Sequence, residues 1–482
     1  KQHDYMSLKK QAVSSMIWTF AQQFGTQLIT FAVSVILARL LLPSDFGTIA
    51  MFTVVMSIAS SLVDGGMSSS LIRSSEIDDR DLSTVFWFNL GVAVAMYIII
   101  FLTAPLIANF YKVEILTPVI RVYSLSIIIG SLTAVQGTRF TKAMDFKTLF
   151  KIQLPSLIIG ALAAVVMAYN GFGIWTLVFY PLIQSVVGGI QLWFYSRWRP
   201  QLIFDRAKFK EHFSFGYKMT LSGLLDTVFT NLYTILIGKY FSSAQLGYYN
   251  RADNLKQLPV NNLSAALNKV TFPLFAKIKD NDVKLKEVYQ KLMKLVIFVI
   301  SPVLFLMMVV AEPMIRFLLT DKWLPAIPYL QVLVLSGILY PIHAYNLNIL
   351  KVKGRSDLFL KLEFWKKGLQ ILTLLVSVSF GVIGIVWGQV IFSVLAFFIN
   401  THYTGKMLNY GSMQQILDLM PIISLSAFIA LVIYFADRFF FHNWLDLPRL
   451  LVLTFLYAGL YLGTVWIFKF KEINYLKDLL KK

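Results

Sequence analysis

Residues 246–275, LGYYNRADNLKQLPVNNLSAALNKVTFPLF, place cations and amides on one helix-length segment inside very apolar sequence. Guanidinium and ammonium groups donate hydrogen bonds to anions, and amides both donate and accept them. A helix turning about 100° per residue gathers six polar side chains within about 80° of one another. They are Asn250, Asn254, Gln257, Asn261, Ser264 and Asn268. Because lipid cannot satisfy six aligned polar groups, we expect this face to line a water-filled cavity.

The same segment carries the cations Arg251, Lys256 and Lys269 and the carboxylate Asp253. A charge near the centre of a bilayer costs about 2.5–3.5 kcal/mol, so an intramembrane cation is a functional candidate. Two structural alternatives stay open. Arg251 and Lys269 lie near opposite ends and could extend their charges to the headgroups. Lys256 could form a purely structural ion pair with Asp253, three residues earlier.

The composition of the chain indicates the membrane that would hold this segment. Of 482 residues, 57% are hydrophobic and 14% charged, and the mean hydropathy is +0.67. Soluble domains carry roughly 25% charged residues, so this chain lies outside their range. The chain contains no Cys, which excludes disulfides and Cys-based metal sites. The first apolar run, 13–42, is too long for a signal-peptide core, and we expect it to remain as an anchor.

We predict an all-α polytopic membrane protein with fourteen transmembrane helices, since each needs about 20 apolar residues. They fall near 13–42, 46–70, 84–110, 116–140, 150–170, 172–196, 213–241, 246–276, 288–311, 325–350, 358–380, 383–405, 416–440 and 448–470.

The basic residues indicate the orientation of these spans. If the N-terminus is cytoplasmic, about 33 of the 44 Lys and Arg residues fall on the cytoplasmic side, as the positive-inside rule predicts. Both termini are then cytoplasmic. The net charge of +19 therefore reflects orientation, and no nucleic-acid partner is expected.

A weak internal repeat appears at an offset of 200 residues. ILARLLLPSDFG (36–47) aligns with LIGKYFSSAQLG (236–247), so that Gly47 matches Gly247. Six spans separate the copies, which therefore run the same way through the membrane. The pattern predicts two six-helix lobes, 1–212 and 213–412, related by an axis along the membrane normal. Residues 413–482 then form an appended pair of spans and a cytoplasmic tail.

Polar residues in the other spans are sparse. Asp64 and Asp226 are carboxylates that a coupling proton could titrate. Taken singly, these two carboxylates and the other polar residues of the spans are expected to form hydrogen bonds between helices. The others are Gln22, Gln23, Gln27, His343, Asn346 and Asn348. The five His are scattered, at 3, 212, 343, 402 and 442. No nucleophile–base pair, metal-ligand spacing or phosphate-binding Gly-rich loop is recognisable, so we expect neither catalytic residues nor a metal site.

Two stretches resemble a known family. ARLLLPSDFG (38–47), after the first span, resembles the signature of polysaccharide transporters. LGYYNRADNLKQLP (246–259), followed by VTFPLF (270–275), is similar to the WzxC-like branch of lipopolysaccharide and exopolysaccharide flippases. That family belongs to the multidrug/oligosaccharidyl-lipid/polysaccharide (MOP) flippase superfamily. The resemblance covers essentially the whole chain.

The resemblance implies a flippase in the bacterial cytoplasmic (inner) membrane. Such a protein moves undecaprenyl-diphosphate-linked oligosaccharide from the inner to the outer leaflet by alternating access, for O-antigen, exopolysaccharide or capsule. Arg251, Lys256, Lys269 and Arg39 would supply cations for the diphosphate, unless Arg39, near a helix end, extends to the headgroups instead. Tyr249 and the amides of Asn250, Asn254, Gln257, Asn261 and Asn268 would contact the glycan. The last two spans would hold the isoprenoid tail.

The resemblance also sets expectations for cofactors and partners. No cofactor is expected, and coupling to H⁺ or Na⁺ stays open. The expected partners are the lipid-linked glycan and membrane lipids, with polysaccharide polymerase machinery as a further candidate and a monomer as the oligomeric state. Two rival functions remain. A multidrug cation antiporter would need buried carboxylates, of which Asp64, Asp226 and Asp253 are candidates, and a membrane glycolipid polymerase or ligase would need a catalytic cluster.

Overall fold

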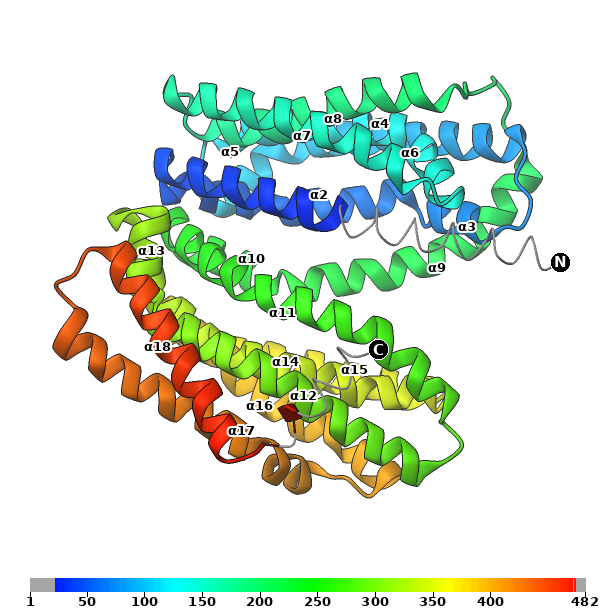
Figure 1. The fold of residues 1–482 in the computed structure, drawn as a ribbon. Coiled ribbons are helices and arrows are strands. Elements are labelled where there is room, and N and C mark those ends of the chain that lie inside the picture. The colour runs from blue at the N-terminus through cyan, green and yellow to red at the C-terminus, as the bar shows by residue number, and fades with distance from the viewer. Residues whose placement is uncertain (1–21, 471, 474–482) are drawn as a thin grey trace. The chain divides into compact units, whose positions relative to one another are not determined.

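A computed structural model describes residues 22–470 and 472–473, except the side chains of 219 and 265–270. Every regular element among these residues is a helix, as predicted. The chain divides into two compact units, 1–247 and 248–482. Figure 1 labels the helices and colours them from blue near the N-terminus to red near the C-terminus.

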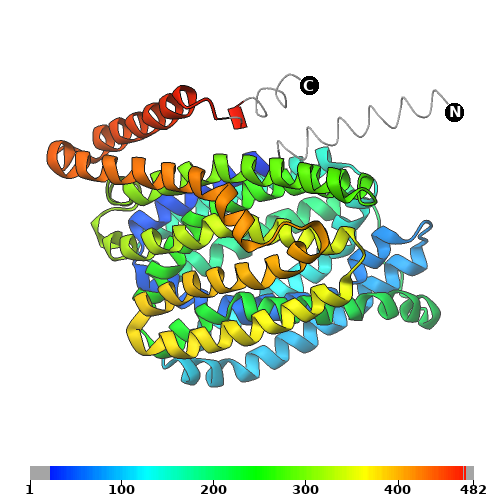
Figure 2. The same ribbon diagram turned by 90° about the horizontal axis from the view of Figure 1, so that it is seen from below.

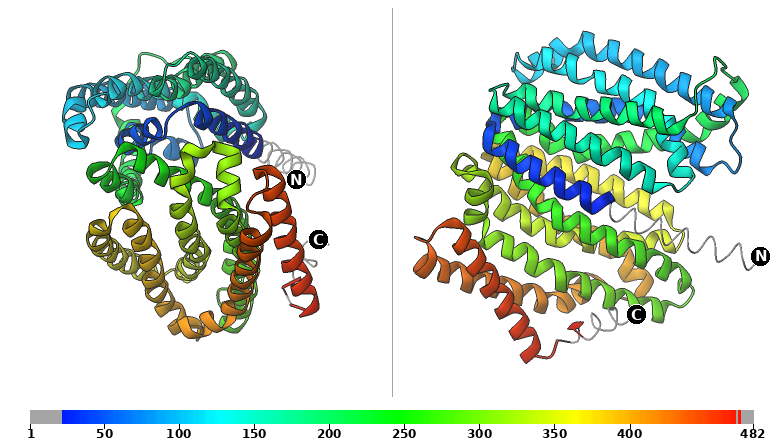
Figure 3. Two further views of the ribbon diagram at one scale, coloured as in Figure 1. Left: turned by 90° about the vertical axis from the view of Figure 1, so that its left-hand side faces the viewer. Right: turned by 45° about the horizontal axis from the view of Figure 1, so that its top comes forward.

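Unit 1 consists of long helices interrupted by short ones. Helix Gln22–Leu40 comes first among the described residues. It is followed by α2 (Pro43–Asp64), α3 (Met67–Arg73), α4 (Asp79–Tyr111), α5 (Leu116–Tyr123), α6 (Leu125–Lys142), α7 (Phe146–Tyr169), α8 (Ile174–Ser196), α9 (Arg206–Thr230) and α10 (Leu232–Tyr240). Helices α7 and α8 lie side by side, and α9 packs against α2, α3 and α4 (Figure 3). The predicted spans 150–170 and 172–196 match α7 and α8 to within four residues. The predicted 46–70 extends six residues past α2, 116–140 is divided between α5 and α6, and α9 begins seven residues before the predicted 213. Residues 13–21 of the predicted first span lie outside the described residues.

Short polar signals set the helix ends in unit 1. Gly65 and Gly66 have φ angles of 55° and 69°, a left-handed conformation that ends α2 and lets α3 begin. Asp78 caps α4 by accepting a hydrogen bond from the Asp81 amide. Asp205 caps α9 by accepting from the amides of Ala207 and Lys208. The polar residues at these breaks in the sequence therefore begin the helices that follow them.

Two glycines bring α2 into close contact with the first turn of α11 (Ser243–Lys277). A Cβ atom added at Gly47 would lie 1.7 Å from the carbonyl oxygen of Ser243. A Cβ atom added at Gly247 would lie 2.0 Å from the carbonyl oxygen of Pro43. The four residues form two pairs separated by the predicted repeat offset, 43 with 243 and 47 with 247. Only glycine permits this approach of the two backbones.

Unit 2 contains the remainder of α11 and the following helices. These are α12 (Asp282–Val309), α13 (Ala311–Leu319), α14 (Ile327–Val352), α15 (Ser356–Ser377), α16 (Gly381–Leu408), α17 (Ser412–Ala436) and α18 (Asp446–Ile467). Three short helical segments connect them, η1 (Asp321–Ala326), η2 (Val378–Phe380) and η3 (Asp437–Phe441). Within unit 2, α14 packs extensively against α16, and α12 packs against both α14 and α17 (Figure 2).

Eleven helical segments among the described residues are long and apolar enough to cross a membrane, or up to twelve with the bent pair α9–α10. One of them, Ser356–Leu408, holds both α15 and α16. Helix α11 is not among the eleven because its amides and charges lower its hydropathy. Large apolar side chains such as Phe455 (73% exposed) and Trp466 (74%) cover outer faces. The chain is therefore a multi-pass membrane protein.

A buried ion cluster anchors the C-terminal helix pair. Arg449, at the start of α18, is 1% exposed and donates two hydrogen bonds to Asp437, at 2.6 and 2.7 Å. It also donates to Glu312 of α13 at 3.1 Å. Further along α18, Tyr461 donates to the carbonyl oxygen of Phe298 on α12 at 2.9 Å. These contacts fasten α18 to α12 and α13 across more than one hundred residues of sequence.

Candidate functional site

Helix α11 holds Arg251 in a buried position. This side chain is 9% exposed, and its guanidinium carbon lies 5.1 Å from the centroid of the Trp323 ring. Trp323 lies on η1 and is fully buried. An aromatic face attracts a cation, and the attraction is stronger when both groups are removed from water. The structure therefore places this cation inside the protein, whereas the headgroup alternative required it to reach the surface.

Lys256 is also buried, at 6% exposure, and pairs with Asp253 at 2.5 Å. This ion pair is the one that the structural alternative predicts. The Lys256 side chain packs against Gly337 of α14. A Cβ atom added at Gly337 would lie only 3.3 Å from Cγ of Lys256. Ion pairing compensates part of the desolvation of a buried ammonium group. A role of Lys256 in binding substrate stays a prediction.

The predicted polar stripe of α11 contains an exposed pair and a half-buried pair of amides. Asn254 and Asn261 are exposed. Asn250 and Gln257 are half-buried, and the Asn250 amide nitrogen and the Gln257 amide oxygen are enclosed without a hydrogen-bond partner among the described residues. Buried polar groups normally find a partner, so these two amides are suited to water or ligand. The members of each pair, Asn254 with Asn261 and Asn250 with Gln257, are seven residues apart. The two pairs lie about 40° apart around the helix axis.

Other predicted residues lie in different surroundings. Tyr249 is 5% exposed, and its hydroxyl accepts a hydrogen bond from Gln389 of α16 at 2.8 Å. Asn268 and Lys269 fall where side chains are not described. In unit 1, Arg39 and Asp226 are exposed, and Asp64 accepts from the Ser68 hydroxyl. The structure thus brings Lys256 together with Asp253, and holds Tyr249 by an interhelical hydrogen bond.

Three of the polar residues for which the sequence predicts interhelical hydrogen bonds form them. Gln22 donates to Gln153 on α7 at 2.6 Å. His343 on α14 lies 3.0 Å from the Ser393 hydroxyl and 3.1 Å from the Asn400 amide nitrogen, both on α16. Asn346 and Gln415, on α14 and α17, exchange two hydrogen bonds of 3.0 Å. The prediction is confirmed for these three residues, whose side chains link neighbouring helices.

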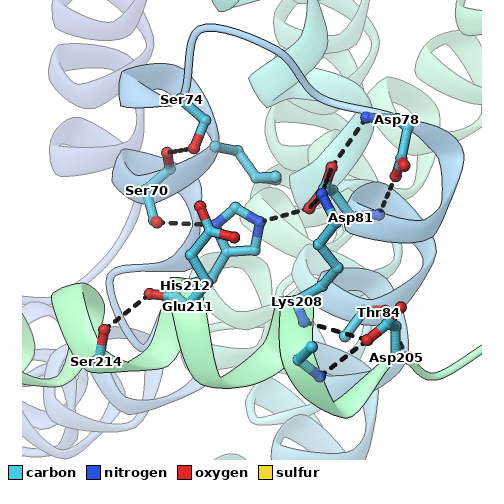
Figure 4. A network of polar contacts seen from close by, with 12 residues as sticks. Ser70, Ser74, Asp78, Asp81, Thr84, Asp205, Lys208, Glu211, His212 and Ser214 are labelled. Carbon is cyan, nitrogen blue, oxygen red and sulfur yellow. Dashed lines mark hydrogen bonds and ion pairs between the residues drawn. The ribbon is translucent and has the colours of Figure 1, made fainter.

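A polar cluster in unit 1 was not recognisable from the sequence (Figure 4). His212 on α9 lies 2.8 Å from the Ser70 hydroxyl through Nδ1 and 3.1 Å from Asp81 through Nε2. Lys208, one turn earlier on α9, donates to Asp81 at 3.1 Å. No motif in the sequence indicates the cluster, because Ser70 and His212 are 142 residues apart.

Close backbone packing holds α9 against α3 and α4 at this cluster. A Cβ atom added at Gly216, one turn after His212, would lie 2.2 Å from the carbonyl oxygen of Gly65. The Asp205 amide donates to the Thr84 hydroxyl on α4 at 3.0 Å. Asp81 also accepts from the Asp78 amide at 2.9 Å. The carboxylate therefore caps its own helix and binds α9 at the same time.

The order Ser70, His212, Asp81 resembles a nucleophile, base and orienting carboxylate. However, these side chains are only 2%, 1% and 2% exposed. A substrate could not reach the Ser70 hydroxyl without separating α3 from α9. Among the described residues no group of three His, Cys, Asp or Glu side chains could hold a metal ion. We interpret the cluster as a structural junction at the ends of α3, α4 and α9.

Asp81→Ala tests this junction. The substitution leaves His212 with an unpaired ring nitrogen in a buried site, and we expect the free energy of unfolding to fall by about 1–3 kcal/mol. Lys208 limits the loss because its side chain is 33% exposed and can turn to water. Thermal unfolding of the purified protein measures the change. Glu76→Ala, at an exposed carboxylate nearby, should unfold like wild type. Equal stability of the two variants would refute the junction.

Comparisons with known proteins match this chain to proteins of polysaccharide biosynthesis. Residues 36–328 match the profile of a family described as polysaccharide biosynthesis protein. The teichuronic acid biosynthesis protein TuaB of Bacillus subtilis (strain 168) is 28% identical over 402 residues, which cover 82% of this chain and 82% of that protein. The lipopolysaccharide biosynthesis protein WzxC of Escherichia coli (strain K12) is 27% identical over 404 residues, again 82% of each chain.

Solved structures share the fold. The lipid II flippase MurJ, in an inward closed conformation, superimposes with a TM-score of 0.77 at 16% identity, covering 94% of this chain and 98% of that chain. An inward-facing multidrug resistance MATE family transporter of the MOP superfamily gives a TM-score of 0.62 at 18% identity, covering 80% and 96%. At these identities the likeness concerns the fold alone.

Proposed function

The chain belongs to the polysaccharide biosynthesis protein family, and from this premise we propose that it is a flippase for lipid-linked oligosaccharide. Membership in a polysaccharide transporter family, which the stretch ARLLLPSDFG and the α11 segment predicted, is thereby confirmed. The protein is a transporter and not an enzyme. The observation that carries the proposal is α11, an amphipathic helix with buried cations and exposed amides in a multi-pass membrane protein.

The chemistry of α11 suits an undecaprenyl-diphosphate-linked glycan. A diphosphate needs cationic hydrogen-bond donors, which Arg251, Lys256 and Lys269 supply, with Arg39 as a further cation. Glycan hydroxyl groups both donate and accept, as do the amides of Asn250, Asn254, Gln257, Asn261 and Asn268 and the hydroxyl of Tyr249. In this proposal the exposed Asn254 and Asn261 meet the glycan first. Arg251 and Lys256 provide a positive potential from beneath them.

The proposal includes an architecture and an orientation. Fourteen spans result when α15 and α16 are counted separately and the bent pair and α11 are added to the other apolar segments. Spans 1–6 (1–212) and 7–12 (213–412) are repeated lobes, and 413–482 is an appended pair with a tail. The reciprocal Gly47–Gly247 contact supports the repeat. The protein resides in the bacterial inner membrane with both termini cytoplasmic, and transport proceeds by alternating access.

Energy coupling and assembly complete the proposal. H⁺ and Na⁺ are the candidate coupling ions, and Asp64 and Asp226 are candidate carboxylates for them. The protein acts as a monomer beside polysaccharide polymerase machinery. The predominance of cations on α11 disfavours the multidrug cation antiporter. Arg251, Lys256 and Lys269 outnumber the one carboxylate, Asp253, and the remaining positive charge repels a cationic drug.

Export of a surface polysaccharide in a host that lacks its own flippase tests the function. We expect wild type to restore the polymer, and Asn254→Asp together with Asn261→Asp to reduce it about 10- to 100-fold. Each change keeps the shape of the side chain but replaces an amide that donates to the glycan with a carboxylate that only accepts. The added negative charge also repels the diphosphate attached to the glycan, and together we expect a loss of about 1.5–3 kcal/mol. Both positions are exposed, so folding should be preserved.

Matched variants separate binding from folding in this assay. Asn443→Asp makes the same change at an exposed position between η3 and α18 and should export normally. Arg251→Lys keeps the charge but loses the guanidinium group that lies over Trp323, so an intermediate export level is expected. Normal export by the Asn254/Asn261 double variant would show that this face does not meet substrate. If wild type fails with several glycans but lowers accumulation of cationic dyes, the antiporter is the correct function.

A further inference from the structure

We infer that a groove between α15 and α16 is a binding site for one anionic phospholipid of the bilayer, separate from the transported glycolipid. The groove has a volume of about 720 Å³, within the range of small-molecule sites. It lies within unit 2, where the two helices run side by side (Figure 2). Its walls are formed by Phe364, Trp365, Leu369 and Leu372 of α15 and Phe398 of α16.

The polar residues of the groove gather at one end. Lys361 lies early in α15, and His402 and Tyr403 lie late in α16, so the antiparallel connection places all three at the same mouth. The opposite end contains Leu372, about 16 Å away along α15 at 1.5 Å per residue. A site that is basic at one end and apolar along its length matches a phosphate headgroup followed by an acyl chain.

The charge at the mouth is uncompensated. Lys361 is exposed and has no carboxylate partner among the described residues. The nearby acids are already paired, Asp357 with Arg355 at 2.7 Å and Glu363 with Lys366 at 2.5 Å. Anionic headgroups are attracted by Lys and Arg residues near a membrane surface, each contributing about 1 kcal/mol. The charge therefore favours an anionic lipid over a zwitterionic one.

Gly368 leaves room in the groove for the acyl chain of the lipid. It lies in the middle of α15, where glycine costs roughly 0.5–1 kcal/mol relative to alanine. A Cβ atom added there would meet no other atom within 4 Å, so helix packing does not require the glycine. A lipid chain lying over this position does require it. Phe364 (77% exposed) and Trp365 (61%) border the same space.

Quenching of Trp365 fluorescence by brominated lipid tests the site. The protein is reconstituted in phosphatidylcholine vesicles containing either brominated phosphatidylglycerol or brominated phosphatidylcholine at equal mole fraction. The signal of Trp365 is the part of the quenching that is lost in Trp365→Phe, and Trp387→Phe on α16 outside the groove serves as control. We expect stronger quenching of Trp365 by the anionic lipid, with an apparent affinity about fivefold higher.

Two variants probe charge and shape. Lys361→Glu should abolish the preference for the anionic lipid, whereas Lys406→Glu, at an exposed lysine of α16 outside the groove, should preserve it. Gly368→Leu should fill the groove and reduce quenching by both lipids. Equal quenching by the two lipids in wild type, or an unchanged preference in Lys361→Glu, overturns the inference. Preferential displacement by undecaprenyl phosphate would overturn it too, by assigning the groove to the transported lipid.

Discussion

Gly47→Ala is expected to destabilise unit 1 by about 3 kcal/mol, and Gly247→Ala to do the same. Either Cβ atom would lie within 2.0 Å of a carbonyl oxygen on the opposing helix, so the two backbones must separate by more than 1 Å. Overpacking of this kind typically costs about 1–3 kcal/mol, and here the obstacle is backbone that cannot rotate away. Thermal unfolding and the amount of protein in the membrane fraction measure the effect.

Gly91→Ala, in the middle of α4, is the matched control for these glycines. A Cβ atom at Gly91 meets no atom within 4 Å, so this variant should be as stable as wild type or gain about 0.5–1 kcal/mol. The double variant Gly47→Ala/Gly247→Ala should lose much less than the sum of the single losses, because one separation of the helices accommodates both methyl groups. Additive losses, or stable single variants, would contradict the close approach.

Asp437→Leu is expected to destabilise the C-terminal helix pair by about 3–5 kcal/mol, because it leaves the buried Arg449 guanidinium without its bidentate partner. Glu312 accepts only one hydrogen bond from Arg449 and is itself one-third exposed. We expect the loop between η3 and α18 to become sensitive to proteolysis at a lower temperature than in wild type. The temperature at which half of the chain is cleaved gives the measurement.

The double variant Arg449→Met/Asp437→Leu distinguishes the ion pair from general packing. Removing both charges leaves no unpaired group, so most of the lost stability should return. Arg316→Ala is the control. Its ion pairs with Glu312 and Asp321 are screened by solvent, since the Arg316 side chain is 34% exposed, and the loss should be at most about 1 kcal/mol. A double variant as unstable as Asp437→Leu would show that Arg449 acts mainly through its bulk.

The helices were predictable because a membrane requires long apolar runs, and these are visible locally in the sequence. The predicted span 172–196 became α8 (Ile174–Ser196), and 448–470 became α18 (Asp446–Ile467). The short helices α3, α5 and α13 were missed. α3 begins after the left-handed Gly65–Gly66 turn, and all three are shorter than one span. Local hydropathy cannot separate such pieces from the runs beside them.

The candidate site was predictable only in part. The amphipathic pattern identified α11, and the i, i+3 spacing anticipated the pair Asp253–Lys256. The position of Arg251 over Trp323 could not be predicted, because 72 residues separate the two and no periodicity links them. The contact between His212 and Asp81 could not be predicted for the same reason. Contacts between distant helices depend on packing that one sequence alone does not reveal.

The contact between α2 and α11 is reciprocal. Gly47 meets Ser243 as Gly247 meets Pro43, which is the pattern of a self-complementary interface. A single helix-to-helix separation therefore sets both distances. A side chain larger than hydrogen at either glycine changes the surroundings of the other, so the two positions act as one structural unit although 200 residues separate them.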